Sequence, residues 1–300
     1  GRWVARDDYV AYLEEYARRR RLRIEFGIEV GRVDREGRGW RLQTSAGPIR
    51  AGSVVIATGH DRVPFVPDWP GREEFAGELL HAAAYRNPVP FRGRSVLVVA
   101  CGNSGADIAA DLAAGGAGRV QVSMRTPPNV FPREFLGVPL MASAPLLERL
   151  PAPVFDAVGR LTQRTIYGDL TPKGLRPAPL GVQSTMLARG ISPVTDDGFV
   201  AALRRDRIGI VPEVVRFEGQ EAVLRDGRRS RPDAVIAATG YRRGLEPLVG
   251  HLGVLDAGGA PAGEAEGLHF IGYRPTLSGQ LHGIKGEARS IARTVRRRSG

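Results

Sequence analysis

One segment constrains the fold of this chain more than any other: an apolar run that passes through small residues directly into a helical pattern. Residues 95–99 read Ser-Val-Leu-Val-Val, which is typical of a strand buried on both faces. Residues 104–112 are rich in alanine and predict a helix, and residues 119–124 predict a second strand. Strand, loop, helix and strand in this order predict one βαβ unit.

The loop between the first strand and the helix has the composition of a pyrophosphate-binding turn. In dinucleotide-binding folds, such a loop directs backbone N–H groups and the positive end of the helix dipole at the ligand. We expect Gly102 to let the phosphates approach and Gly105 to let the helix pack on the strand. A merely structural turn is the alternative to a dinucleotide site. The candidate residues are Ala100, Cys101, Gly102, Asn103, Ser104 and Gly105.

Ala100 departs from the usual pattern of such loops, and Cys101 has two possible interpretations. Ala100 stands where G-x-G-x-x-G has its first glycine, and we expect its methyl group to tighten the turn and weaken binding. Cys101 is the only cysteine, and we interpret it as a small residue that fits the turn rather than a reactive thiol. A single cysteine excludes an internal disulfide and a two-cysteine redox centre within these residues, and it fits a reducing cytoplasm.

Arg125 follows the second strand of the unit. NAD-preferring folds place an acidic residue there to hold the ribose 2′-hydroxyl, whereas arginine suits a 2′-phosphate. The sequence therefore favours NADPH over NADH. The alternative is one more surface arginine in an arginine-rich chain.

The remaining periodic segments predict further α/β structure. Residues 53–57 and 233–238 are continuously apolar or nearly so, and we expect the first to be a central parallel strand buried on both faces. Short β-like runs within residues 23–49 and 208–224 predict two antiparallel meanders. Helices are expected from Asp7 or Asp8 to about Arg20 and over 283–296, the last strand over 268–271, and irregular chain with short helices over 126–194.

Charge and hydropathy narrow the classes of partner. The formal net charge is +11 and comes almost entirely from arginine, which makes nucleic acid an alternative partner. Neither an aromatic stacking platform nor a recognition-helix pattern accompanies the charge, so we expect no nucleic-acid partner. Apolar runs such as 234–238 fall far short of the roughly 20 residues of a spanning helix. We therefore expect no membrane partner and a cytoplasmic protein, and the sequence carries no signal for an oligomeric state.

A spaced set of residues just ahead of the βαβ unit carries a family resemblance. The set matches the F-x-G-x-x-x-H-x-x-x-Y-[KR] signature of flavin-containing monooxygenases, and related Baeyer–Villiger enzymes usually carry Trp at the Tyr position. The histidine resembles the family's linker histidine, which is linked to domain movement rather than proton transfer. The signature residues are Phe75, Gly77, His81, Tyr85 and Arg86.

The resemblance extends through most of the chain. Two Ala-Thr-Gly segments look like the crossings between the FAD and NADPH domains of such proteins, and residues 125–134 and 278–281 are similar to plant indole-pyruvate monooxygenases and their bacterial relatives. The positions that this resemblance adds to the cofactor-binding set are Thr58, Gly59, Thr239, Gly240, Gln280 and Leu281.

The resemblance implies an α/β fold with two dinucleotide-binding, Rossmann-like domains. An NADPH-binding domain, 67–240, would be inserted in an FAD-binding domain formed by 1–66 and 241–300. Because no FAD phosphate loop precedes Trp3, we expect the first βαβ of the FAD domain to be missing from an N-terminally truncated chain that retains little FAD.

The implied function is that of an FAD- and NADPH-dependent monooxygenase. NADPH would reduce the flavin, dioxygen would add to it, and the flavin hydroperoxide would oxygenate a small organic substrate, either a soft N or S nucleophile or a keto acid. The cofactors carry the chemistry, so we name no catalytic side chain and no metal ligand. The alternatives are a disulfide reductase or another NAD(P)H–flavin oxidoreductase of the same build, and a noncatalytic nucleotide-binding sensor.

Overall fold

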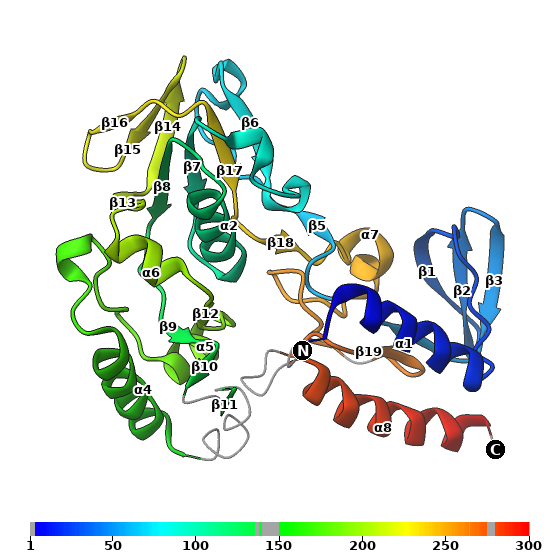
Figure 1. Ribbon diagram of the computed structural model, residues 1–300. Helices are drawn as coiled ribbons and strands as arrows, with labels where there is room; N and C mark the ends of the chain where they lie inside the picture. The colour runs from blue at the N-terminus through cyan, green and yellow to red at the C-terminus, as the bar shows by residue number, and fades with distance from the viewer. Residues whose placement is uncertain (1–3, 136–137, 140–149, 264, 275–279, 300) are drawn as a thin grey trace.

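The computed structural model describes residues 4–135, 138–139, 150–263, 265–274 and 280–299. They form two lobes, one around a parallel sheet with a helix on one face, and one that holds a three-stranded sheet and the first and last helices of the chain (Figure 1). The chain passes between the lobes at β5 (Val63–Pro64) and β18 (Tyr241–Arg242).

The first lobe is built on a five-stranded parallel sheet. Its strands, in spatial order, are β13 (Ile208–Pro212), β8 (Arg119–Met124), β7 (Ser95–Val99), β17 (Ala234–Ala237) and β6 (Glu78–His81). The central strands β7 and β17 are buried and apolar along nearly their whole length, as a parallel sheet covered on both faces requires. The predicted βαβ unit is confirmed.

Helices cover one face of this sheet and a small antiparallel sheet covers the other. α2 (Asn103–Ala114) joins β7 to β8 and packs beside α6 (Phe199–Arg204). On the other face Leu97 and Val235 pack against Phe217 and its neighbours. That second layer contains β14 (Val214–Glu218), β15 (Glu221–Leu224) and β16 (Arg229–Ser230).

The meander predicted over 208–224 is therefore partly wrong. β14 and β15 are antiparallel, but β13 pairs in parallel with β8. The reason is that Ile208 is buried in the α2 core while Val211 packs on the opposite face, so this strand is covered on both sides like its neighbours.

Between β8 and β13 the chain forms a helical insertion. Its α4 has 16 residues, so the prediction of only short helices in this segment is wrong. The elements are β9 (Val130–Pro132), β10 (Glu134–Phe135), β11 (Val138–Pro139), α4 (Ala152–Tyr167), the 3₁₀ turn Thr171–Lys173, α5 (Val182–Arg189) and β12 (Val194–Asp196), with β12 parallel to β9.

The second lobe packs around Trp40, Val54 and Leu268. α1 follows the predicted helix closely, but residues 23–26 form no strand. The elements are α1 (Arg6–Arg19), β1 (Val30–Glu36), β2 (Gly39–Thr44), β3 (Gly47–Ala51), β4 (Val54–Ile56), α7 (Glu246–Val249), the 3₁₀ turn Gly250–Leu252, β19 (Leu268–Phe270) and α8 (Gln280–Ser299).

The expectation for 53–57 is also corrected. Within the described residues β4 pairs only with β19, in parallel, and Val55 is 44% exposed. Continuous apolarity indicated burial on both faces, whereas the described part of this lobe covers only one face of the strand.

Two short strands connect the lobes. β5 (Val63–Pro64) pairs antiparallel with β18 (Tyr241–Arg242), and the Phe65 N–H donates to the Gly240 carbonyl over 3.0 Å. Three 3₁₀ turns complete the first lobe, at Arg72–Glu74, Ala82–Ala84 and Val89–Phe91. Among the helices that the structure describes, none combines the length and apolarity needed to cross a membrane.

Candidate nucleotide site

The predicted loop lies at the carboxyl end of the central strand β7. Within this loop, Gly102 is the N-cap of α2, and as a glycine it provides no side-chain cap. The first N–H groups of the helix receive no side-chain cap from this residue, and together with the helix dipole they favour an anion at this end.

The two glycines of the loop have different surroundings. A β-carbon added to Gly105 would lie 2.2 Å from the Ala100 carbonyl oxygen, whereas one added to Gly102 would meet nothing within 4 Å. Gly102 has φ −86°, which any residue can adopt. The protein's own packing thus requires glycine at 105 but not at 102, where the loop has open space beside it.

Ala100 and Cys101 differ in how well they suit the turn. Ala100 stands at a glycine position of the pattern and has φ +77°. This left-handed conformation is energetically unfavourable for a residue with a β-carbon. Cys101 is buried, and burial raises the pKa of its thiol to about 12. The thiol is therefore protonated at neutral pH, in agreement with a packing role.

Asn103 has partners that the sequence did not indicate. Its side-chain Nδ2 donates to the Pro193 carbonyl over 3.2 Å, and its Oδ1 accepts from the Thr195 N–H over 2.7 Å. Asn103 therefore ties the loop to β12. No local sequence signal could have found this link, because the partners lie about ninety residues away along the chain.

Arg125 follows directly after β8, where the prediction requires it. Its side chain is 78% exposed, and its Nη1 lies 4.0 Å from Oε1 of Glu213. Glu213 follows β13, the strand beside β8. The sequence missed this residue because β13 was expected in a meander instead of the parallel sheet.

The signature residues Phe75 and Gly77 serve packing. The ring of Phe75 lies 4.9 Å from that of Phe217, centroid to centroid. A β-carbon on Gly77 would lie 2.5 Å from the Phe75 ring. These two positions fix the entry into β6.

His81 connects the end of β6 to the crossing between the lobes. Its Nδ1 accepts from the Ala83 N–H over 3.0 Å, which leaves Nε2 to donate to the Gly240 carbonyl over 2.9 Å. Its ring also contacts that of Tyr241 edge to face, at 4.9 Å. This histidine therefore connects the end of β6 to the chain at the second crossing.

The last two signature residues, Tyr85 and Arg86, form hydrogen bonds close to His81. The Tyr85 hydroxyl donates to Oδ2 of Asp111 on α2 over 2.6 Å. Arg86 Nη1 donates to the Ala83 carbonyl over 2.6 Å. The signature as a whole joins β6, α2 and the crossing.

The other predicted cofactor residues lie at the crossings and in the second lobe. Thr58 Oγ1 is 2.7 Å from the Tyr273 hydroxyl, and Gln280 Nε2 donates to the Gly272 carbonyl over 2.5 Å, so these two side chains meet adjacent residues of one loop. Leu281 is 68% exposed. Positions 278 and 279 lie outside the described residues.

Gly59 and Gly240 close the two Ala-Thr-Gly segments. They have φ +74° and +82°, and a β-carbon on either would meet nothing within 4 Å. The Thr239 hydroxyl donates to the Phe65 carbonyl. Both segments therefore end in left-handed glycine turns where the chain leaves one lobe for the other.

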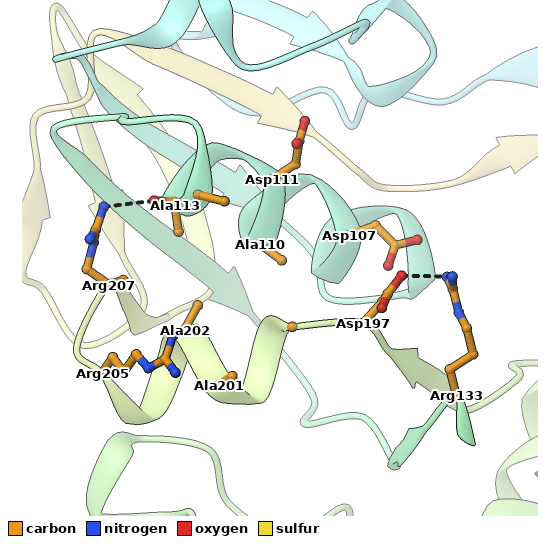
Figure 2. Close-up of a pocket in the computed structure, with 12 residues that line it drawn as sticks. Asp107, Ala110, Asp111, Ala113, Arg133, Asp197, Ala201, Ala202, Arg205 and Arg207 are labelled. Carbon is orange, nitrogen blue, oxygen red and sulfur yellow. Dashed lines mark hydrogen bonds and ion pairs between the residues drawn. The ribbon is translucent and has the colours of Figure 1, made fainter. Parts of the chain in front are cut away.

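A cavity of about 620 Å³ lies elsewhere on the first lobe, between α2 and α6. Figure 2 shows the ion pair of Arg133 with Asp197, 2.8 Å apart, near Asp107, and the 2.8 Å bond from Arg207 to the Ala113 carbonyl. No residue of the 100–105 loop lines this cavity. No cluster of three possible metal ligands occurs among the described residues.

Comparisons with known proteins agree with the geometry. The pyridine nucleotide-disulphide oxidoreductase family matches residues 2–132. Indole-3-pyruvate monooxygenase YUCCA8 of Oryza sativa subsp. indica is 38% identical over 252 residues, covering 80% of this chain and 60% of that protein. Probable indole-3-pyruvate monooxygenase YUCCA3 of Arabidopsis thaliana is 31% identical over 310 residues, covering 97% of this chain and 70% of that protein.

The fold is shared with a solved structure. A flavin-containing monooxygenase from Stenotrophomonas maltophilia superposes with a TM-score of 0.67 at 22% identity, covering 98% of this chain and 78% of that one. The chain spans about 60% of the length of the first of the plant relatives.

A parallel sheet with a glycine loop before α2, joined by two crossings to a second lobe, is the fold that this chain shares with flavin-dependent monooxygenases, a class of oxidoreductases. Within that class, the chain belongs to the flavin-containing monooxygenase family. The family resemblance and the α/β fold predicted from the sequence are both confirmed.

Proposed function

We propose that this chain provides the nucleotide-binding framework of an NADPH-dependent flavoprotein monooxygenase that oxygenates a small organic molecule with dioxygen. The observation that carries the proposal is the open space at Gly102, where the protein's own packing does not require glycine. A pyrophosphate in that space would meet the uncapped start of α2. NADPH therefore fits the residues present.

Residues 67–240 would form the NADPH-binding domain, and 1–66 with 241–300 the FAD-binding domain. The hydrophobic cores support this division, since two core clusters draw their buried residues from 75–236 and a third draws its own from 33–56 and 245–273. β4 and β19 form a parallel pair, and Val55 on β4 is exposed. The exposed face of this pair would pack against other parts of an FAD domain.

Different residues would bind different groups of the two cofactors. Backbone N–H groups of 102–105 would hold the pyrophosphate of NADPH, and Arg125 would pair with its 2′-phosphate. Thr58, Gly59 and Gln280 would face the FAD. When bound, the two cofactors supply hydride transfer and the activation of dioxygen. We assign no side chain as acid, base or nucleophile.

Among the candidate substrates, a keto acid is favoured over a soft nucleophile, because the relatives named above act on indole-3-pyruvate. A disulfide reductase is disfavoured by the single, buried Cys101. A nucleotide sensor is the remaining alternative, and the strained Ala100 is its best support.

The test uses the protein isolated from its own organism. We expect a flavin absorption spectrum that NADPH bleaches without air and that returns, with oxygenated product, when air and a keto acid are admitted. Absence of flavin would favour the sensor. Flavin that is bleached but never yields an oxygenated product would favour a reductase.

A further inference from the structure

Glu213 is held rigidly beside the position proposed for the 2′-phosphate. Pro212 pairs with Met124 in the parallel ladder of β13 and β8, so the residues after both strands are neighbours. The buried hydroxyl of Ser123 donates to the Pro212 carbonyl over 2.9 Å and accepts from the Val214 N–H over 3.1 Å. The backbone on both sides of Glu213 is thus bonded to β8.

The side chain of Glu213 is also oriented. Arg225 donates from Nε and Nη2 to its Oε2, the first over 2.7 Å, and the Arg225 N–H donates to the Glu213 carbonyl over 2.8 Å. The other carboxylate oxygen, Oε1, lies 4.0 Å from Nη1 of Arg125. The Glu213 side chain is 23% exposed, so its charge is screened less than that of a fully solvated group.

A fixed carboxylate in this place acts against a 2′-phosphate. It offsets part of the charge of Arg125, and it repels a phosphate that approaches Arg125. A carboxylate is also the group with which NAD-preferring folds hold the ribose hydroxyls. In this chain the carboxylate is delivered by the strand beside β8, next to an arginine.

We propose that Glu213 is a specificity-determining residue that limits the preference for NADPH over NADH. The inference rests on the proposed nucleotide site and adds to it a residue with the opposite effect to Arg125. It implies that the protein accepts both nucleotides and that replacing one carboxylate shifts the ratio of their affinities.

The test measures the Kd of NADPH and of NADH for Glu213→Gln by calorimetry at low ionic strength. Glutamine keeps an oxygen acceptor for Arg225 but removes the charge. We expect NADPH to bind about fivefold more tightly, NADH to bind no more tightly, and the gain to shrink as salt is added. Glu221→Gln is the matched control, because Glu221 is ion-paired to Arg229 on β15 and β16, and it should leave both Kd values unchanged.

A second variant keeps the inference testable if Glu213→Gln does not fold. Arg225→Gln frees the carboxylate to pair more fully with Arg125, and we expect it to weaken NADPH a few fold while sparing NADH. If the ratio of the NADPH and NADH affinities stays unchanged, or if both affinities change equally, the role proposed for Glu213 is wrong. The proposed nucleotide site would still stand. If neither nucleotide binds the unaltered protein, the proposed nucleotide site fails and the inference fails with it.

Discussion

The carbonyl oxygen of Ala100 lies against the α-carbon of Gly105 so closely that a β-carbon there would be only 2.2 Å away. Gly105→Ala must therefore push α2 off the end of β7. We expect the free energy of unfolding to fall by about 1–3 kcal/mol, as measured by urea denaturation. A variant as stable as the unaltered protein would show that the helix and strand are packed less closely than described.

Ala100→Gly should relieve the strain at φ +77°. A left-handed conformation costs a residue with a β-carbon about 1–2 kcal/mol, and glycine removes this cost. The greater flexibility of glycine in the unfolded chain offsets part of the gain. We expect a small gain in stability, with NADPH binding unchanged or tighter in calorimetry. Weaker NADPH binding would mean that the register assigned to the loop is wrong.

Arg125→Ala should separate the two nucleotides. A charge-assisted contact contributes about 1.5–3 kcal/mol, or roughly ten- to a hundredfold in affinity, and we expect the lower end because Glu213 lies beside Arg125. NADH has no 2′-phosphate and should bind almost as before. Arg231→Ala, on the same lobe and bonded to Gln220, is the control; equal losses for both nucleotides would assign the phosphate to another residue.

Stability should depend on pH through His60, which contacts Tyr273 near the first crossing. Burial, and then the nearby Arg243, lower the pKa of His60 below its usual 6.5. The unfolded chain therefore binds the proton first, so this contribution to stability is complete above pH 6.5 and is lost as the pH falls through the folded-state pKa. In urea titrations from pH 5 to 8, His60→Gln should flatten the decline below pH 6.5. Equal curves for this variant and the unaltered protein would contradict the shift.

The sequence predicted the parts of the fold that depend on local pattern. The βαβ unit follows from an apolar strand, a small-residue loop and an alanine-rich helix, all within residues 95–124. The buried β17 and the terminal helices followed from the same kind of local signal.

Relationships between distant segments could not be predicted in this way. An apolar, β-branched run does not tell which strand lies beside it, so β13 was placed in a meander instead of next to β8. The pairing of Glu213 with Arg125 depends on that neighbour and was missed with it. Asn103 was predicted as a loop residue, but its bonds to residues 193 and 195 depend on how the insertion returns to the sheet.

The central claim, a dinucleotide site at the start of α2, is tested most directly by Gly102→Ala. The added β-carbon meets no atom of the protein within 4 Å, and alanine in place of glycine at an N-cap should cost less than about 1 kcal/mol of stability. If a pyrophosphate occupies that space, the methyl group must displace it. Calorimetric titration with NADPH should therefore show at least about tenfold weaker binding, about 1.4 kcal/mol, in a protein that unfolds almost as the unaltered one does. Unchanged NADPH affinity in Gly102→Ala would contradict the account.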